Sequence, residues 1–268
     1  MKSLKVLIPS IAIIAGCSAS EANTTPPAKE VVTQASKLHH LIKIAVIDTG
    51  IADSLRYSPM ICETGSKDFT DTGLTDHHGH GTHIAGLIDQ YAKNKFLGYG
   101  VYPKTIANMK ANFCIVVLKY YDPTKPYNNN LESMKKAIRA AIDEKVDFIN
   151  ISGGGTDSSS EEKALVEEAL NKGITLVFAA GNEKSDIDQA GKHYYPAYYD
   201  KRIVVVGNKE ESGKRAPTSN YGSTVKVWEF GTNARSYSSA EGQAFMTGTS
   251  QATAIKTGKM VRELLGNQ

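Results

Sequence analysis

From residue 41 onward, short apolar runs alternate with longer segments in which apolar side chains recur every three or four positions. The short runs predict buried strands, and the longer spacing predicts amphipathic helices. The expected strands span residues 43–48, 114–119, 148–152, 175–180, 203–206 and 225–227. The expected helices span residues 82–91, 131–142, 161–172 and 250–265. This alternation predicts an α/β fold of three layers, with helices on both faces of a mainly parallel β-sheet.

Polar residues near the ends of these segments indicate where the helices begin and end. Asparagines precede Leu131 and can cap its helix, and Ser160 can cap the helix that follows it. Acidic residues fill the first turn of that second helix, and Gly173 lies at its end. The residues of the last helix that we expect to face inward are Ile255, Val261, Leu264 and Leu265.

The first forty residues differ from the rest of the chain. Two lysines precede an apolar run at residues 6–15, which is too short to span a bilayer and is typical of a signal peptide. The run ends in Ile-Ala-Gly-Cys, which resembles the lipobox of bacterial lipoproteins, in which the cysteine is acylated. An ordinary secretion signal with an incidental Cys17 is the alternative. We expect a signal peptide at residues 1–16, a lipidated Cys17 and polar tether at 17–40, and one domain at 41–268.

Composition supports a single globular domain and bears on the classes of partner that it binds. The chain has 268 residues, of which 41% are hydrophobic and 22% charged, which suits one substantial core. Removing residues 1–16 takes away two lysines and no acidic residue, which lowers the formal net charge from +3 to +1. Such a balance gives no support for a nucleic-acid partner. Cys62 and Cys114 then remain, and in an exported protein they can form a disulfide or stay as two separate thiols.

Four of the seven histidines fall within seven residues, at positions 77, 78, 80 and 83. Histidine exchanges protons near neutral pH and is also the commonest metal ligand. Glycines flank His80, and the residues after it can begin a helix. The cluster alone is therefore compatible with a metal site, with one catalytic histidine at a helix start, or with a solvated loop.

Five polar residues should meet at one edge of the predicted sheet. Asp48, Ser152 and Asn182 follow predicted strands, and His80 and Ser250 stand at predicted helix starts. In such sheets, ligands bind beyond the carboxyl ends of the strands. A serine becomes a good nucleophile when a base removes its proton and an acid orients that base. Asp48, His80 and Ser250 supply the acid, the base and the nucleophile in that chain order.

The sequences around these residues resemble those of subtilisin-like serine proteases (subtilases, family S8). Asp48 lies in Ile-Ala-Val-Ile-Asp-Thr-Gly-Ile, His80 in His-Gly-Thr-His-Ile-Ala-Gly, and Ser250 in Thr-Gly-Thr-Ser-Gln-Ala-Thr. Two further motifs, Ile-Asn-Ile-Ser-Gly-Gly-Gly at 149–155 and Ala-Ala-Gly-Asn at 179–182, lie between them. The resemblance covers residues 41–258. It implies a subtilisin-like fold and hydrolysis of peptide bonds through an acyl-enzyme intermediate.

The resemblance also separates the histidines by role. His80 would be the base, which leaves His83 as a structural residue and His77 and His78 as loop residues outside the triad. A zinc site in this cluster is then disfavoured, because no Glu or Cys lies near these histidines at the spacing of a metal motif.

Further residues gain roles from the same resemblance. Asn182 would bind the oxyanion together with the backbone N–H of Ser250. Tyr194 would lie at the base of the primary specificity pocket and make that pocket shallow. The segment that pairs with an extended substrate would consist of Ser152, Gly153 and Gly154.

The resemblance bears on the cysteines and on metals as well. The family fold places the strands near Cys62 and Cys114 side by side, which favours the disulfide. Calcium sites are frequent in the family, but the corresponding segment at residues 92–100 contains no carboxylate. Calcium prefers several oxygen ligands that usually include carboxylates, so we expect no metal and no cofactor.

Some departures from the family pattern leave a second function open. Gln251 and Ala254 replace a Met and a Pro of the family motif, and residues 18–40 are too short and polar to be a prodomain. The alternative is a catalytically silent lipoprotein that binds peptides in the same cleft. In both cases we expect a monomer with protein or peptide partners, exported and held to a membrane by its lipid anchor.

Overall fold

The computed structural model describes residues 40–98, 101–125, 129–240 and 242–266. The predictions for residues 1–39, including lipidation at Cys17, lie outside the described residues. The strands are β1 (Ile42–Asp48), β2 (Lys67–Asp68), β3 (Phe113–Lys119), β4 (Phe148–Ile151), β5 (Thr175–Ala179), β6 (Val204–Lys209), β7 (Val227–Phe230), β8 (Ala234–Tyr237) and β9 (Gln243–Met246). The helices are α2 (His80–Lys93), α3 (Pro103–Ala107), α4 (Asn130–Asp143), α5 (Ser160–Asn171) and α6 (Thr249–Gly266).

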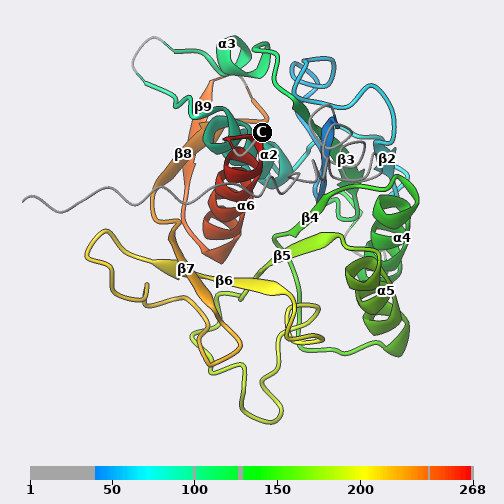
Figure 1. Cartoon of the computed structure of the whole chain (residues 1–268), viewed down its shortest axis with the longest axis vertical. Helices are drawn as coiled ribbons and strands as arrows, with labels where there is room; N and C mark the ends of the chain where they lie inside the picture. The colour runs from blue at the N-terminus through cyan, green and yellow to red at the C-terminus, as the bar shows by residue number, and fades with distance from the viewer. Residues whose placement is uncertain (1–39, 99–100, 126–128, 241, 267–268) are drawn as a thin grey trace, which may run out of the picture. The chain divides into compact units, whose positions relative to one another are not determined.

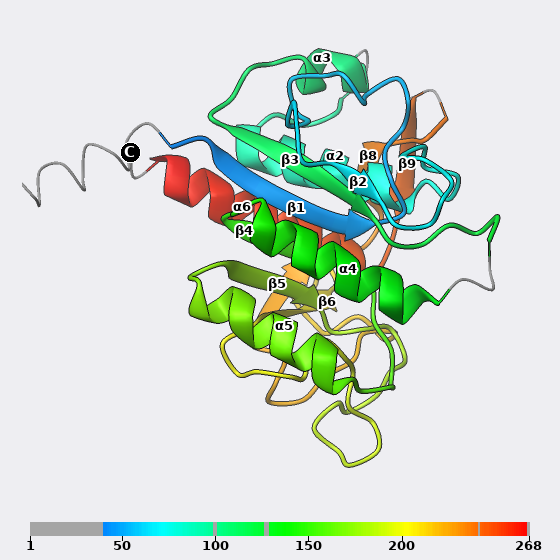
Figure 2. The same cartoon turned by 90° about the vertical axis from the view of Figure 1, so that its right-hand side faces the viewer.

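A seven-stranded sheet forms the centre of the described domain, in the order β2-β3-β1-β4-β5-β6-β7. Every neighbouring pair in it is parallel. Helices α2 and α6 lie on one face, and α4 and α5 lie on the other (Figures 1 and 2). The prediction of a three-layer α/β fold with a mainly parallel sheet is confirmed.

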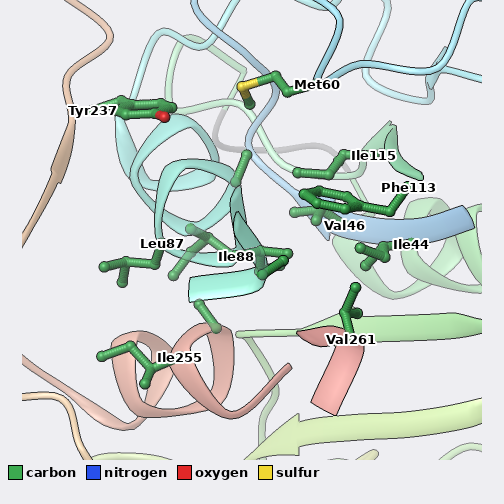
Figure 3. Close-up of a cluster of buried hydrophobic side chains, with 14 of the residues drawn as sticks. Ile44, Val46, Met60, Leu87, Ile88, Phe113, Ile115, Tyr237, Ile255 and Val261 are labelled. Carbon is green, nitrogen blue, oxygen red and sulfur yellow. The ribbon is translucent and has the colours of Figure 1, made fainter. Parts of the chain in front are cut away.

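Both faces of the sheet are covered by helices, and successive residues of a strand point to opposite faces. Neighbouring residues of one strand are therefore buried in different apolar clusters. In β1, Ile44 and Val46 belong to one apolar cluster, whereas Ala45 and Ile47 belong to the other. Figure 3 shows the first cluster, in which α2 and α6 supply apolar side chains that face those of β1 and β3. A strand buried on both faces reads as a continuous apolar run, which is why β1 and β3 were recognisable in the sequence.

Several predicted boundaries need correction. The strand expected at residues 225–227 instead begins at Val227 and continues to Phe230, because the backbone N–H of Val225 closes a turn on Gly222. The cap of α5 is Ser159 rather than Ser160, since the Ser159 hydroxyl accepts the N–H of Glu162. Leu264 was expected to face inward, but it is 43% exposed, whereas the neighbouring Leu265 packs against an apolar cluster of the core.

Other elements were missed. The antiparallel pair β8–β9 has the sequences Ala-Arg-Ser-Tyr and Gln-Ala-Phe-Met, which contain no β-branched residue and show no clear alternation. Strand β2 has only two residues, and α3 has five. Segments this short carry too little periodicity to be recognised.

Within the described part of the chain, none of the helices combines the length and apolar character that crossing a membrane would require.

Candidate active site

The carboxyl edge of the sheet gathers the polar residues that the sequence singled out. Asp48 ends β1 and Ser152 follows β4, and the two strands are paired in register, Ile47 opposite Ile151. His80 is the first residue of α2, and Ser250 is the second residue of α6. Strands β1 and β4 are parallel neighbours that end side by side, which brings Asp48 and Ser152 to one edge of the sheet.

Asp48 and His80 form an acid–imidazole pair in which the carboxylate is buried and the imidazole is half-buried. The Nδ1 atom of His80 lies 2.8 Å from Oδ1 of Asp48, whose carboxylate also accepts the backbone N–H of Thr49 at 2.8 Å. Because a carboxylate only accepts, Nδ1 carries the proton and Nε2 is left to act as a base. Burial lowers the pKa of His80, but the charge of Asp48, its hydrogen bond and the charge of Asp76 together raise that pKa above its ordinary value.

Asp76 links the side chain of Thr49, next to Asp48, with the backbone next to His80, a role that its place in the sequence did not indicate. Its carboxylate accepts the hydroxyl of Thr49 at 2.8 Å and the backbone N–H of Gly79 at 2.7 Å. It also accepts the backbone N–H and the hydroxyl of Thr82 at 2.8 and 2.6 Å. Gly79 precedes α2 and has no side chain to cap it, so Asp76 satisfies the first turn from outside the helix. A carboxylate six residues before the helix predicted at residues 82–91 was the available signal.

Ser250 lies at the same edge, next to the end of β4. Its hydroxyl donates to the carbonyl oxygen of Ser152 at 2.9 Å, and the Ser152 hydroxyl donates to the Ser250 carbonyl at 3.3 Å. Ser250 is 8% exposed and Asp48 is 4% exposed, so both groups are largely shielded from water. No hydrogen bond joins Ser250 to His80 among the described residues in this conformation.

The side chain of Asn182 faces the start of α6. Its Oδ1 accepts the backbone N–H of Thr249 at 3.0 Å. Since only the oxygen of an amide can accept, this bond fixes the orientation of the group and leaves Nδ2 available as a donor. The N–H of Ser250 is also among the first helical donors that have no partner within the helix. Two donors are therefore available beside the serine hydroxyl.

The glycine segment after β4 lies against tyrosine rings. A Cβ atom at Gly153 would be 2.2 Å from the hydroxyl oxygen of Tyr120. At Gly154 it would be 2.3 Å from the carbonyl oxygen of Tyr195 and 2.7 Å from the ring of Tyr194. Only glycine fits these approaches. Tyr194 thus packs directly against the predicted substrate segment, and burial together with the charge of Glu183 raises the pKa of its hydroxyl.

The other histidines of the cluster point to different partners. His83 is fully buried, and its Nε2 donates to the carbonyl oxygens of Ala234 at 3.0 Å and Ala244 at 3.2 Å. His77 lies 2.7 Å from Asp122, whereas His78 is exposed and meets the ring of His80 edge-on at 6.1 Å. The imidazoles therefore diverge rather than converge on one point.

Cys62 and Cys114 are joined by a disulfide, with Cα atoms 5.0 Å apart and a sequence separation of 52. The bond links the segment before β2 to the second residue of β3. The cross-link lies on the strand that leads to the site.

Solved structures with similar folds define the class of this protein. A cold-adapted subtilisin-like serine proteinase aligns over 85% of this chain and 77% of its own, with a TM-score of 0.65 and 24% identity. A lanthipeptide protease aligns over 87% of this chain and 76% of its own, with a TM-score of 0.69 and 19% identity. The domain is thus an α/β protein of subtilisin-like fold.

The chain belongs to the subtilase family, whose model (Peptidase S8) matches residues 40–262. It is 34% identical over 214 residues to a thermostable alkaline protease of Halalkalibacterium halodurans, which covers 79% of this chain and 53% of that protein. It is 31% identical over 226 residues to the major intracellular serine protease of Bacillus subtilis, covering 82% of this chain and 67% of that protein. The chain spans about half the length of most of these curated relatives.

Proposed function

We propose that this protein is a serine endopeptidase that uses Asp48, His80 and Ser250 as its catalytic triad. The observation that carries the proposal is the 2.8 Å contact between His80 Nδ1 and Asp48, which leaves Nε2 of a half-buried imidazole free to take a proton. A rotation of the Ser250 side chain away from the Ser152 carbonyl would deliver its hydroxyl proton to His80. The serine oxygen then attacks the peptide carbonyl, and the C–N bond breaks as His80 returns the proton to the leaving amine. Water, deprotonated by His80, hydrolyses the resulting acyl-enzyme and frees Ser250.

The negative charge of the tetrahedral intermediate would be stabilised by Asn182 Nδ2 and the backbone N–H of Ser250. The support is the bond from Thr249 N–H to Asn182 Oδ1, which leaves the amide nitrogen as the donor of this side chain. An amide donor of this type contributes roughly 10²–10³ in rate.

The substrate would be a protein or peptide that binds as an extra strand along Ser152, Gly153 and Gly154. Tyr194 fills space beside Gly154, so a small side chain would be preferred at the residue preceding the cleaved bond. We also propose that the mature chain is an exported lipoprotein anchored to a membrane through Cys17, and that it acts as a monomer.

The test is labelling of the chain with a fluorophosphonate, which reacts only with activated serines. Wild type should be labelled, and Ser250→Ala and His80→Ala should not. His78→Ala is the matched control, because this exposed histidine lies beside His80 and should not be needed for labelling. Incubation with a peptide library then identifies the residue that precedes the cleaved bond.

One observation favours the alternative of a silent peptide-binding protein. The Ser250 hydroxyl donates to the Ser152 carbonyl instead of to His80, which is the arrangement expected of a serine with a purely structural role. A folded chain that is not labelled and returns every library peptide intact would support this alternative.

A further inference from the structure

Lys119, the last residue of β3, is completely buried. Its ammonium nitrogen lies 2.6 Å from Oδ2 of Asp122, whose side chain is equally buried, and it donates to the carbonyl oxygen of Thr75 at 2.6 Å. Removing two charges from water is unfavourable unless their geometry is well satisfied. A buried ion pair at this place therefore calls for an explanation beyond stability.

The carboxylate of Asp122 contacts several hydrogen-bond donors of the loop that precedes α2. Its Oδ2 accepts the hydroxyl of Thr72 at 2.8 Å and lies 2.7 Å from Nδ1 of His77. Lys119 contacts Thr75 and Asp122 contacts His77, so the pair holds the chain on both sides of Asp76. Asp76 in turn bonds to Gly79 and Thr82, the residues on either side of His80 and Gly81.

The same lysine lies behind Asp48. Lys119 and Asp48 are partners in the parallel register of β3 and β1, and the N–H of Tyr120 donates to the Asp48 carbonyl at 3.0 Å. A Cβ atom at Gly50 would be only 3.2 Å from Cδ of Lys119, so the lysine stem packs against the backbone just after Asp48. The side chain of Lys119 thus packs against Gly50, two residues after the acid, and bonds to Thr75 in the loop that leads to the base.

We propose that Lys119 is a positioning residue, which with Asp122 holds the loop at residues 72–79 against the end of β3 and so fixes the imidazole of His80 on Asp48. The inference rests on the proposed peptidase function for its catalytic consequence. It goes beyond that function, because neither Lys119 nor Asp122 contacts the reacting groups.

The chain contains a matched control at the other end of α2. Lys93 lies 2.6 Å from Asp89, and the two side chains are 4% and 0% exposed. Lys93 also donates to the carbonyl oxygen of Ile106, as Lys119 does to that of Thr75. The two lysines have similar burial and partners, but only Lys119 adjoins the site.

The experiment measures kcat and KM for peptide hydrolysis by the Lys119→Met and Lys93→Met variants of the full chain. Titration with a fluorophosphonate gives the concentration of active sites in each sample. Lys119→Met should lower kcat by about tenfold or more with KM within about twofold, because small displacements of catalytic groups are costly in rate. Lys119→Arg should recover part of the loss. Lys93→Met should keep kcat within about twofold of wild type. An unchanged kcat in Lys119→Met overturns the inference.

A second measurement does not depend on activity. The Nδ1 proton of His80, followed by NMR in ¹⁵N-histidine-labelled chain, should exchange faster with water in Lys119→Met than in wild type or Lys93→Met. Equal exchange in all three overturns the inference, even if the chain proves catalytically silent. If Lys119→Met does not fold, Asp122→Asn should show the same loss of kcat and the same faster exchange. Wild-type values in that variant contradict the inference.

Discussion

Asp76 contacts neither Asp48 nor His80, yet its carboxylate bonds to residues beside both of them. Burial raises its pKa, but the hydrogen bonds from Thr82, Gly79 and Thr49 outweigh that effect and lower the pKa below its ordinary value. It therefore stays charged at neutral pH, and this charge helps to raise the pKa of His80. The sequence pointed to the histidines, whereas the role of Asp76 depends on contacts across 27 residues to Thr49.

Asp76→Asn should shift the acid limb of the kcat/KM profile to lower pH. The proposed base works only when His80 is neutral, and removing a nearby negative charge lowers the pKa at which His80 takes up a proton. The measurement is kcat/KM against pH on one peptide. Asp68→Asn is the control, because Asp68, at the end of β2, accepts similar bonds from Thr70 and Gly73 in the segment between β2 and Asp76. A folded Asp76→Asn protein with an unmoved acid limb would count against this coupling.

At the scale of elements, the start of α5 shows what local sequence cannot decide. Three consecutive serines precede its acidic first turn, and any of them has the chemistry of a cap. Tertiary contacts select Ser159, since the Tyr199 hydroxyl accepts the Ser159 N–H at 2.7 Å and donates to Glu162 at 2.8 Å. Long apolar segments such as β1, β3 and α4 were predictable, whereas short elements and exact helix starts depended on such distant partners.

Ser159→Ala should lower the free energy of unfolding by about 1 kcal/mol, the usual value of a serine cap. Ser160→Ala is the matched control, because Ser160 is exposed inside the first turn and alanine is a good helix former. Urea unfolding of both variants in a Ser250→Ala chain, which removes self-cleavage, provides the comparison. An equal loss in the two variants would contradict the assignment of Ser159 as the cap.

For the whole molecule, the pattern of the sequence was sufficient for the architecture and for the edge at which the polar residues meet. It could not reveal the second layer of contacts, because Lys119, Asp122 and Asp76 contact Thr75, His77 and Thr49, which lie 44, 45 and 27 residues away in the sequence. The histidines behave similarly. His80 and His83 are three residues apart, but one faces a carboxylate and the other faces two carbonyls of the β8–β9 pair.

These two histidines should make stability depend on pH in opposite directions. Asp48 and Asp76 raise the pKa of His80, so its contribution is fully present below about pH 6.5 and is lost as the pH rises through its raised pKa. Burial lowers the pKa of His83 to about 4. Below about pH 6.5 the unfolded chain protonates this residue but the folded chain does not, so stability falls until the pH reaches about 4.

His83→Asn in a Ser250→Ala chain tests the second half of this argument. The free energy of unfolding of the parent should decrease between about pH 6.5 and pH 4 by about 3 kcal/mol more than that of the variant, because asparagine does not titrate. Urea unfolding at several pH values gives both slopes, and the exposed His78→Asn should keep the parental slope. Parallel slopes for parent and His83→Asn would mean that the pKa of His83 is the same in the folded and unfolded chains, which would contradict the effect of burial on this residue.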